Sequence, residues 1–219
     1  MKVIMFGATG MVGQAVLREC LVDDGVEAVL AVGRRPTGET HPKLHEMLRA
    51  DLFDVDVPEA SLAGYDACFF CLGVSSVGMS EAEYTRLTFD LTMGWARALA
   101  LVSPSLAFFY VSGAGTGGTA MWARVKGRTE SALLDLFAKA YMVRLAALLP
   151  MHGEAPRMRG ARALYAVARP LLPLIRAVAP NAVVTTEELG RAMIRVAREG
   201  FSRRVLEASD LRALGSRRT

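Results

Sequence analysis

The sequence is poor in cysteine, in aromatic residues and in long apolar runs. It holds three cysteines among 219 residues, an odd number that does not build a disulfide framework. No apolar run approaches the roughly 20 residues that a membrane span needs. The first apolar run ends at Gly7, too early for the core of a signal peptide. These absences favour a reducing, cytoplasmic setting.

Acidic residues are absent from residues 155–186, which carry five arginines. Charge is therefore uneven: residues 1–110 contain 8 Lys and Arg against 14 Asp and Glu, and residues 111–219 contain 18 against 8. Such asymmetry raises the question of an anionic partner. Residues 157–178 could meet an anionic substrate, lie on an anionic membrane surface, or form the solvated side of a lid helix. Of these, the membrane contact is not favoured. No set of stacking aromatics is present, so no nucleic-acid partner is expected.

Short apolar segments alternate with helical patterns along the whole chain. Hydrophobic residues make up 52% and charged residues 22%, which indicates a packed protein of about one domain. Strands are expected at 2–6, 27–32, 44–48, 66–72, 106–111, 141–145 and 204–207. Helices are expected at 11–21, 80–102, 121–138, 158–179 (in two pieces) and 187–198.

This alternation predicts an α/β fold, a doubly wound parallel sheet of the Rossmann type with helices on both faces. The predicted strand order is 3-2-1-4-5-6-7, in a single domain over residues 1–219 with residues 150–186 as a small C-terminal lid. Ser80 is expected to open its helix with a capping box, and Thr186 to cap the last long helix. Cys68 and Cys71 should lie on opposite faces of a strand, which argues against a metal or redox pair.

Three glycines follow the first strand and open the first helix, in the order Gly7, Gly10 and Gly13. The first allows a tight turn, the second lets the backbone approach a pyrophosphate, and the third lets helix and strand pack closely. The free N–H groups of the helix N-terminus then attract the phosphates. The strand, loop, helix and second strand occur in the order that a dinucleotide site requires.

The end of the second strand indicates which dinucleotide is bound. An NAD site usually has an acidic residue there for the ribose hydroxyls, whereas this chain has Arg34 and Arg35. Two guanidinium groups can hold a 2′-phosphate through charge-assisted bonds. NADP(H) is therefore preferred over NAD(H). Asp51, which follows the third strand, could accept a hydrogen bond from the adenine amino group.

The motifs together resemble the short-chain dehydrogenases/reductases. The glycine loop, residues 71–73, Ser112 and the stretch 122–130 follow one another in the family's order. The closest likeness is to the NAD-dependent epimerase/dehydratase-like branch that includes Tat-interacting-protein-like oxidoreductases. The family's active site holds a serine, a tyrosine, and a lysine four residues after the tyrosine. By this resemblance Ser112 orients the substrate, and Lys126 clamps the cofactor ribose.

The tyrosine position of the resemblance is occupied by Trp122. An indole N–H donates a hydrogen bond but does not exchange protons near neutral pH. A proton would then come from another group, such as Tyr165, His152 or a water. A second departure is Leu145 after Arg144, where the family often has proline.

Two hypotheses follow from this pattern. The first is an oxidoreductase of small carbonyl or alcohol substrates, and the second is a catalytically silent protein that senses NADP(H). A small-molecule substrate is the expected partner, and self-association into a homo-oligomer stays open. No metal is expected. The predicted catalytic residues are Ser112, Lys126 and Trp122. The predicted cofactor contacts are Gly7, Thr9, Gly10, Met11, Val12, Gly13, Arg34, Arg35, Asp51, Leu52, Cys71, Leu72, Gly73 and Lys126.

Overall fold

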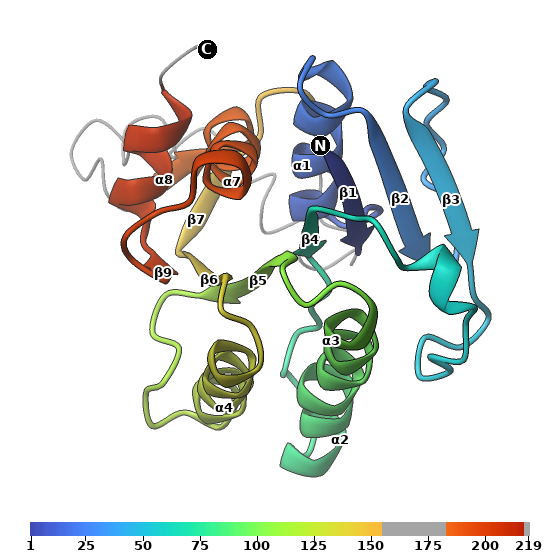
Figure 1. Cartoon of the computed structure of the whole chain (residues 1–219). Helices are drawn as coiled ribbons and strands as arrows, with labels where there is room; N and C mark the ends of the chain where they lie inside the picture. The colour runs from blue at the N-terminus through green and yellow to red at the C-terminus, as the bar shows by residue number, and fades with distance from the viewer. Residues whose placement is uncertain (155–182, 217–219) are drawn as a thin grey trace.

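A seven-stranded parallel sheet forms the centre of the protein (Figure 1). The computed structural model describes residues 1–154 and 183–216. The strand order is β3-β2-β1-β4-β5-β6-β9, so the predicted doubly wound order is confirmed. The strands are β1 (Lys2–Phe6), β2 (Ala28–Gly33), β3 (Leu44–Leu48), β4 (Ala67–Phe70), β5 (Ala107–Gly113), β6 (Ala140–Leu145) and β9 (Val205–Leu206).

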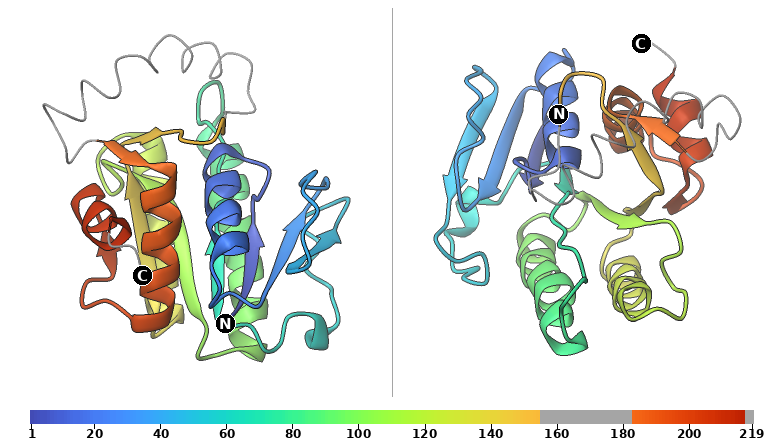
Figure 2. Two further views of the ribbon diagram at one scale, coloured as in Figure 1. Left: turned by 90° about the horizontal axis from the view of Figure 1, so that it is seen from above. Right: turned by 180° about the vertical axis from the view of Figure 1, so that it is seen from behind.

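Helices cover both faces of the sheet (Figures 1 and 2). One face carries α2 (Glu81–Thr85), α3 (Leu91–Val102) and α4 (Met121–Leu136), and the other carries α1 (Met11–Val22) and α7 (Thr186–Glu199). The last described helix is α8 (Ala208–Gly215). Strand residues are buried on both faces because helices lie on each side: in β4, Phe69 belongs to one hydrophobic cluster and Phe70 to the other.

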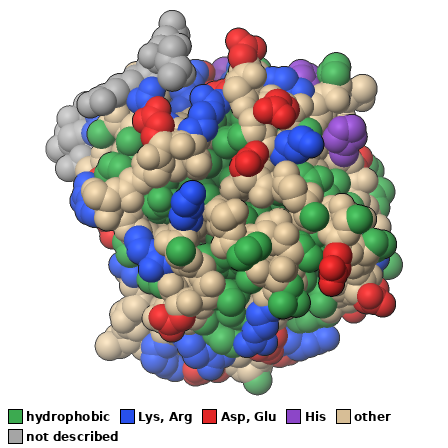
Figure 3. Space-filling model, viewed as in Figure 1, with side chains coloured by type: hydrophobic (Ala, Val, Ile, Leu, Met, Phe, Trp, Pro, Cys, Tyr) green, Lys and Arg blue, Asp and Glu red, His purple; other side chains and the backbone are tan. Residues whose placement is uncertain are grey.

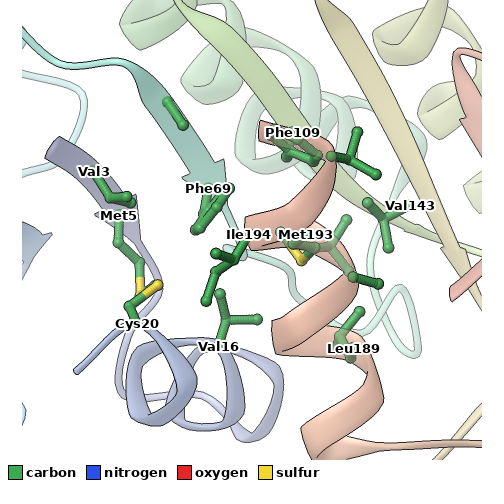
Figure 4. Packing of buried hydrophobic residues seen from close by; sticks show 14 of the residues in the cluster. Val3, Met5, Val16, Cys20, Phe69, Phe109, Val143, Leu189, Met193 and Ile194 are labelled. Atoms are coloured by element: carbon green, nitrogen blue, oxygen red, sulfur yellow. The ribbon is translucent and has the colours of Figure 1, made fainter. Parts of the chain in front are cut away.

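Helix α1 packs directly against α7, although the two are far apart in sequence. Ile194 of α7 lies between Val16 of α1 and the sheet residue Phe69, and Met193 lies toward Phe109 and Val143 (Figure 4). A methyl group placed on Gly190 would come within 2.5 Å of Cγ of Glu19, so the helices are in close contact. Glu19 also accepts a bond of 3.1 Å from Arg191.

The structure corrects several expected boundaries. The helix expected at 80–102 contains a π-helical turn, Arg86–Asp90, between α2 and α3. The Thr92 hydroxyl donates to the Thr88 carbonyl at 2.6 Å, which competes with the backbone ladder of an α-helix. Ser80 forms the expected capping box, whereas the last long helix is capped by Thr185 rather than Thr186.

A second, two-stranded parallel sheet was not predicted. It pairs β7 (Ala147–Leu149) with β8 (Val183–Thr185), two strands too short to give a clear pattern. The helices expected at 158–179, with most of the lid, lie outside the described residues. Cys68 and Cys71 contact opposite hydrophobic clusters, as predicted, and the three cysteines are free. None of the helices in residues 1–154 and 183–216 is long and apolar enough to cross a bilayer.

Candidate dinucleotide and substrate site

The glycine loop lies where β1 ends and α1 begins, beside the loop that follows β4. Gly7 has a φ of +79°, and a methyl group there would meet the Cys71 carbonyl carbon at 2.7 Å. A methyl group on Gly13 would meet the Gly7 carbonyl oxygen at 2.0 Å. Both positions therefore require glycine, because backbone atoms occupy the space that a side chain would need.

The N-terminus of α1 is suited to an anion. Gly10 is its N-cap, and its N–H donates to the Gly7 carbonyl at 2.9 Å. The first turn contains no acidic residue, and within the described chain no side chain caps it. The positive end of the helix dipole is thus not neutralised locally. Met11 and Val12 lie in this turn, and their side chains pack against the hydrophobic cluster beneath.

A further contact steadies the loop before α1. The Gln14 side chain donates to the Thr9 carbonyl at 3.1 Å. This bond ties the predicted phosphate loop to the first full turn of the helix. A loop whose backbone is held before the ligand arrives loses less conformational freedom on binding.

Arg34 and Arg35 follow β2 and are exposed. Neither forms a hydrogen bond or ion pair with another part of the described chain. The same loop is fixed a little further on, where Thr37 donates from its backbone N–H and its hydroxyl to Glu46, at 2.6 and 2.7 Å. Two cations on a tethered loop beside the carboxyl end of β2 fit a phosphate group.

Asp51 and Leu52 lie in the loop after β3 and serve the local structure. The Asp51 carboxylate accepts a bond of 2.9 Å from the Phe53 N–H. Leu52 is buried, and its carbonyl accepts a bond of 2.8 Å from the Trp95 indole. The exposed carboxylate of Asp51 remains open to further donors, and the predicted adenine contact stays a prediction.

Residues 71–73 form the β4 side of the site. The Cys71 N–H donates to the Phe6 carbonyl at 2.9 Å, which continues the pairing of β1 and β4 past the strand ends. Burial raises the pKa of the Cys71 thiol to about 12, so the thiol is protonated and unreactive at neutral pH. Leu72 packs against the hydrophobic cluster on the α3 side. Among the described residues, a methyl group on Gly73 would meet nothing within 4 Å.

The buried side chain of Glu130 lies at the carboxyl end of β5, and this residue was not among the predicted site residues. Ser112 Oγ donates to Glu130 Oε1 at 2.6 Å. Glu130, from α4, also accepts bonds from Arg144 of β6, at 3.2 Å from Nε and 2.6 Å from Nη2. Ser112 and Arg144 are register partners in the β5–β6 ladder. Glu130 therefore ties the ends of two neighbouring strands to one helix.

Lys126 lies one helical turn before Glu130. Its Nζ is 3.5 Å from the Val111 carbonyl oxygen and 5.7 Å from the centroid of the Tyr110 ring. Burial lowers the pKa of its ammonium group to about 8, and the negative charge of Glu130 opposes this shift. The amine thus lies on the Ser112 side of β5, with an appreciable neutral fraction near pH 8.

Trp122 occupies the first turn of α4 and covers the loop that follows β5. A methyl group on Gly113 would lie 3.6 Å from its Cζ3 atom, and one on Gly115 would lie 3.7 Å from its Cη2 atom. The indole thus packs over two glycines next to Ser112. Its chemistry is limited to donation of one hydrogen bond.

His152 has a partner that the sequence did not indicate. Its Nε2 lies 2.7 Å from Glu187 Oε1, and this hydrogen bond is the main reason that the pKa of Glu187 is lowered. Glu187 also pairs with Arg191 at 3.1 Å. The other predicted proton donor, Tyr165, lies outside the described residues. Among the residues that the structure does describe, no group of three His, Cys, Asp or Glu side chains is placed to hold a metal.

Solved structures of the same fold include sugar-nucleotide epimerases and a short chain dehydrogenase family protein. The chain superposes on a UDP-N-acetylglucosamine 4-epimerase from Methanobrevibacter ruminantium M1 with a TM-score of 0.68 and 15% identity, covering 94% of this chain and 75% of the other. A UDP-glucuronic acid 4-epimerase from Bacillus cereus in complex with NAD gives 0.68 and 14%, over 94% and 76%. A short chain dehydrogenase family protein from Francisella tularensis subsp. tularensis SCHU S4 gives 0.62 and 14%, over 91% of each chain.

Comparison of sequences gives one curated relative and a family model. It is 29% identical over 141 residues to the leucinostatins biosynthesis cluster protein T of Purpureocillium lilacinum, over 62% of this chain and 52% of that protein. The chain thus aligns with about half the length of this curated relative. The model of the NAD dependent epimerase/dehydratase family matches residues 3–129, which include the glycine loop, Ser112 and Lys126. The chain therefore belongs to the NAD dependent epimerase/dehydratase family.

Proposed function

We propose that the chain binds NADP(H) and interconverts a small alcohol and its carbonyl compound. The observation that carries the proposal is the glycine loop, in which Gly7 and Gly13 leave no room for a side chain and the N-terminus of α1 is uncapped. Such a helix end holds a pyrophosphate. Arg34 and Arg35 are suited to the additional phosphate of NADP(H). The UDP-glucuronic acid 4-epimerase of the same fold is in complex with NAD, which supports a dinucleotide as the ligand.

Side chains of the protein would bind the cofactor, contact the substrate and move the proton. When bound, the nicotinamide supplies hydride transfer. Lys126 holds the ribose from the first turns of α4, and Ser112 contacts the reacting group of the substrate from the end of β5. Trp122 shields the loop after β5 and offers one N–H donor. His152 or a water moves the proton, because an indole does not titrate near neutral pH.

Thermal unfolding with NADP⁺ and with NAD⁺ tests the cofactor proposal. At a hundredfold excess over Kd, a ligand adds about 2.7 kcal/mol to the free energy of unfolding. For a chain of this size that is a rise in Tm of about 5–10 °C. Arg34→Ala combined with Arg35→Ala should weaken NADP⁺ binding and leave NAD⁺ binding unchanged. Arg97→Ala, which removes an exposed arginine from α3, is the control. Equal shifts for NADP⁺ in both variants would contradict the phosphate assignment.

A second candidate function is an NADP(H)-sensing protein without turnover. It is favoured by Trp122 at the acid–base position and by the hydrogen bond that commits the Ser112 proton to Glu130. The discriminating measurement is absorbance of NADPH during incubation of the NADP⁺-loaded protein with alcohols that bind to it. Binding of cofactor and alcohol without NADPH formation at any pH from 6 to 10 would favour the sensor.

A partner for the basic segment, residues 157–178, is a separate proposal. Residues 157–178 lie outside the described chain, so a small anionic substrate or an anionic membrane is argued from the sequence alone. On the face drawn in Figure 3, basic side chains gather along the lower edge beside acidic ones. Sedimentation of the protein with and without vesicles of anionic lipid, and its mass in solution, test membrane contact and homo-oligomerisation.

A further inference from the structure

The hydroxyl of Ser112 has one proton and two neighbours that can only accept it. One is Glu130 Oε1 at 2.6 Å, and the other is the Val143 carbonyl oxygen at 3.5 Å. The shorter contact is to a carboxylate, and hydrogen bonds to ionised acceptors are about twice as strong as neutral ones. The Ser112 proton is therefore committed to Glu130, and the oxygen offers lone pairs to any further group.

The contacts of Glu130 keep the Ser112 hydroxyl proton directed at the Glu130 carboxylate. Glu130 is 3% exposed and receives two N–H bonds from Arg144, whose guanidinium is charged at every working pH. Arg144 stands opposite Ser112 in the β5–β6 ladder, so all three side chains are held by regular secondary structure. Moving the Ser112 proton to a ligand would leave a buried carboxylate with one bond fewer, which is costly.

We propose that Glu130 is a positioning residue that makes Ser112 a hydrogen-bond acceptor, so that the site selects a ligand with a hydroxyl donor rather than a carbonyl oxygen at this point. The proposal rests on the proposed function and deepens it, because it names the alcohol as the preferred bound form. A carbonyl oxygen facing Ser112 would meet lone pairs and gain no bond. One hydrogen bond of ordinary strength corresponds to about a tenfold difference in affinity.

Binding of matched pairs to the NADP⁺-loaded full chain tests the inference. The probes are 2-butanol with 2-butanone, cyclohexanol with cyclohexanone, and 1-phenylethanol with acetophenone, with Kd values from ligand-observed NMR. In the wild type at least one alcohol should bind about tenfold more tightly than its ketone. Ser112→Ala, which keeps the Glu130–Arg144 pair and should therefore fold, should bring the ratio to about one. Glu130→Gln should lower it several-fold, since a carboxamide oxygen holds the Ser112 proton less firmly.

Ser131→Ala is the matched control, because it removes a serine hydroxyl elsewhere, on α4, one that donates to the Gly127 carbonyl at 3.1 Å. It should leave the ratio unchanged. A purely structural Ser112 would alter Tm in the Ser112→Ala variant and leave the ratio as it was, which would overturn the inference. It is equally overturned when no alcohol binds more tightly than its ketone, including when no probe binds. The affinity for NADP⁺ is measured first, so failure of the proposed function is recorded separately as absence of cofactor binding.

Discussion

Replacement of Gly13 by alanine is the sharpest test of how the glycine loop packs. The added methyl group would lie 2.0 Å from the Gly7 oxygen and 2.8 Å from the Ala8 Cα atom. These are backbone atoms between β1 and α1, so relief requires the loop and the helix to separate. Overpacking of this kind costs about 1–3 kcal/mol, and alanine regains up to about 1 kcal/mol of helix propensity.

We expect Gly13→Ala to lower the free energy of unfolding by about 2 kcal/mol, which is a fall in Tm of about 4–8 °C. Gly10→Ala is the matched control in the same loop. Within residues 1–154 and 183–216, a methyl group there meets only the Gly7 oxygen, at 3.4 Å, and the residue has a φ of −82°. Its Tm should stay within about 3 °C, while its affinity for NADP⁺ should fall because the backbone is kept from the pyrophosphate.

The assay is thermal and urea unfolding followed by circular dichroism, together with titration of NADP⁺. Equal stability of Gly13→Ala and wild type would refute the close approach of helix and strand. A large loss of stability in Gly10→Ala would refute the separation between a packing glycine and a ligand-facing one.

Three further predictions concern the β5 end of the site. Trp122→Tyr introduces a titratable phenol four positions before Lys126, and should raise NADPH formation from the best-binding alcohol about 100-fold. Equal rates at equal cofactor affinity would contradict this. Because the folded pKa of Lys126 is about 8 against an ordinary 10.5, its contribution to stability is greatest above pH 10.5 and falls as pH drops to 8. In urea unfolding, the free energy of unfolding of the wild type relative to that of Lys126→Met should therefore rise between pH 8 and 10.5. A difference that stays constant over this pH range would refute the burial of the amine. Arg144→Ala leaves the buried Glu130 without its charged partner and should lower the free energy of unfolding by about 3 kcal/mol. Arg124→Ala breaks an exposed ion pair and should lower it by under about 1 kcal/mol. Similar losses for the two variants in chemical denaturation would contradict this difference.

The sheet was predictable because its strands are apolar on both faces and are separated by amphipathic helices. The run of apolar residues that contains β4 is the clearest case, since burial on both sides removes alternation. The pair β7 and β8 was not predictable, because three-residue strands carry no period. The π-helical turn was not predictable either, because helical periodicity does not distinguish one π-helical turn from an α-helix.

The arrangement of the candidate site was predictable where one short stretch of chain supplies several of its parts. The glycine loop and the Trp122–Lys126 spacing are of this kind. Glu130 was missed, although its position one turn after Lys126 placed it on the same helix face. Its partners are Ser112 and Arg144 on two strands, and their register appears only in the folded sheet. The partner of His152 is 35 residues away, too far for any local pattern.

The contact between α1 and α7 has a consequence for synthesis of the chain. Glu19 and Arg191 are separated by 172 positions, so α1 leaves the ribosome long before the helix that covers it exists. At about 5–20 residues per second, the α7-facing side of α1 waits roughly 10–30 s for its partner. During that interval the side chains around Val16 are available to other chains or to chaperones. Variants that weaken α7 should therefore reduce the yield of folded protein in cells more than their effect on equilibrium stability suggests.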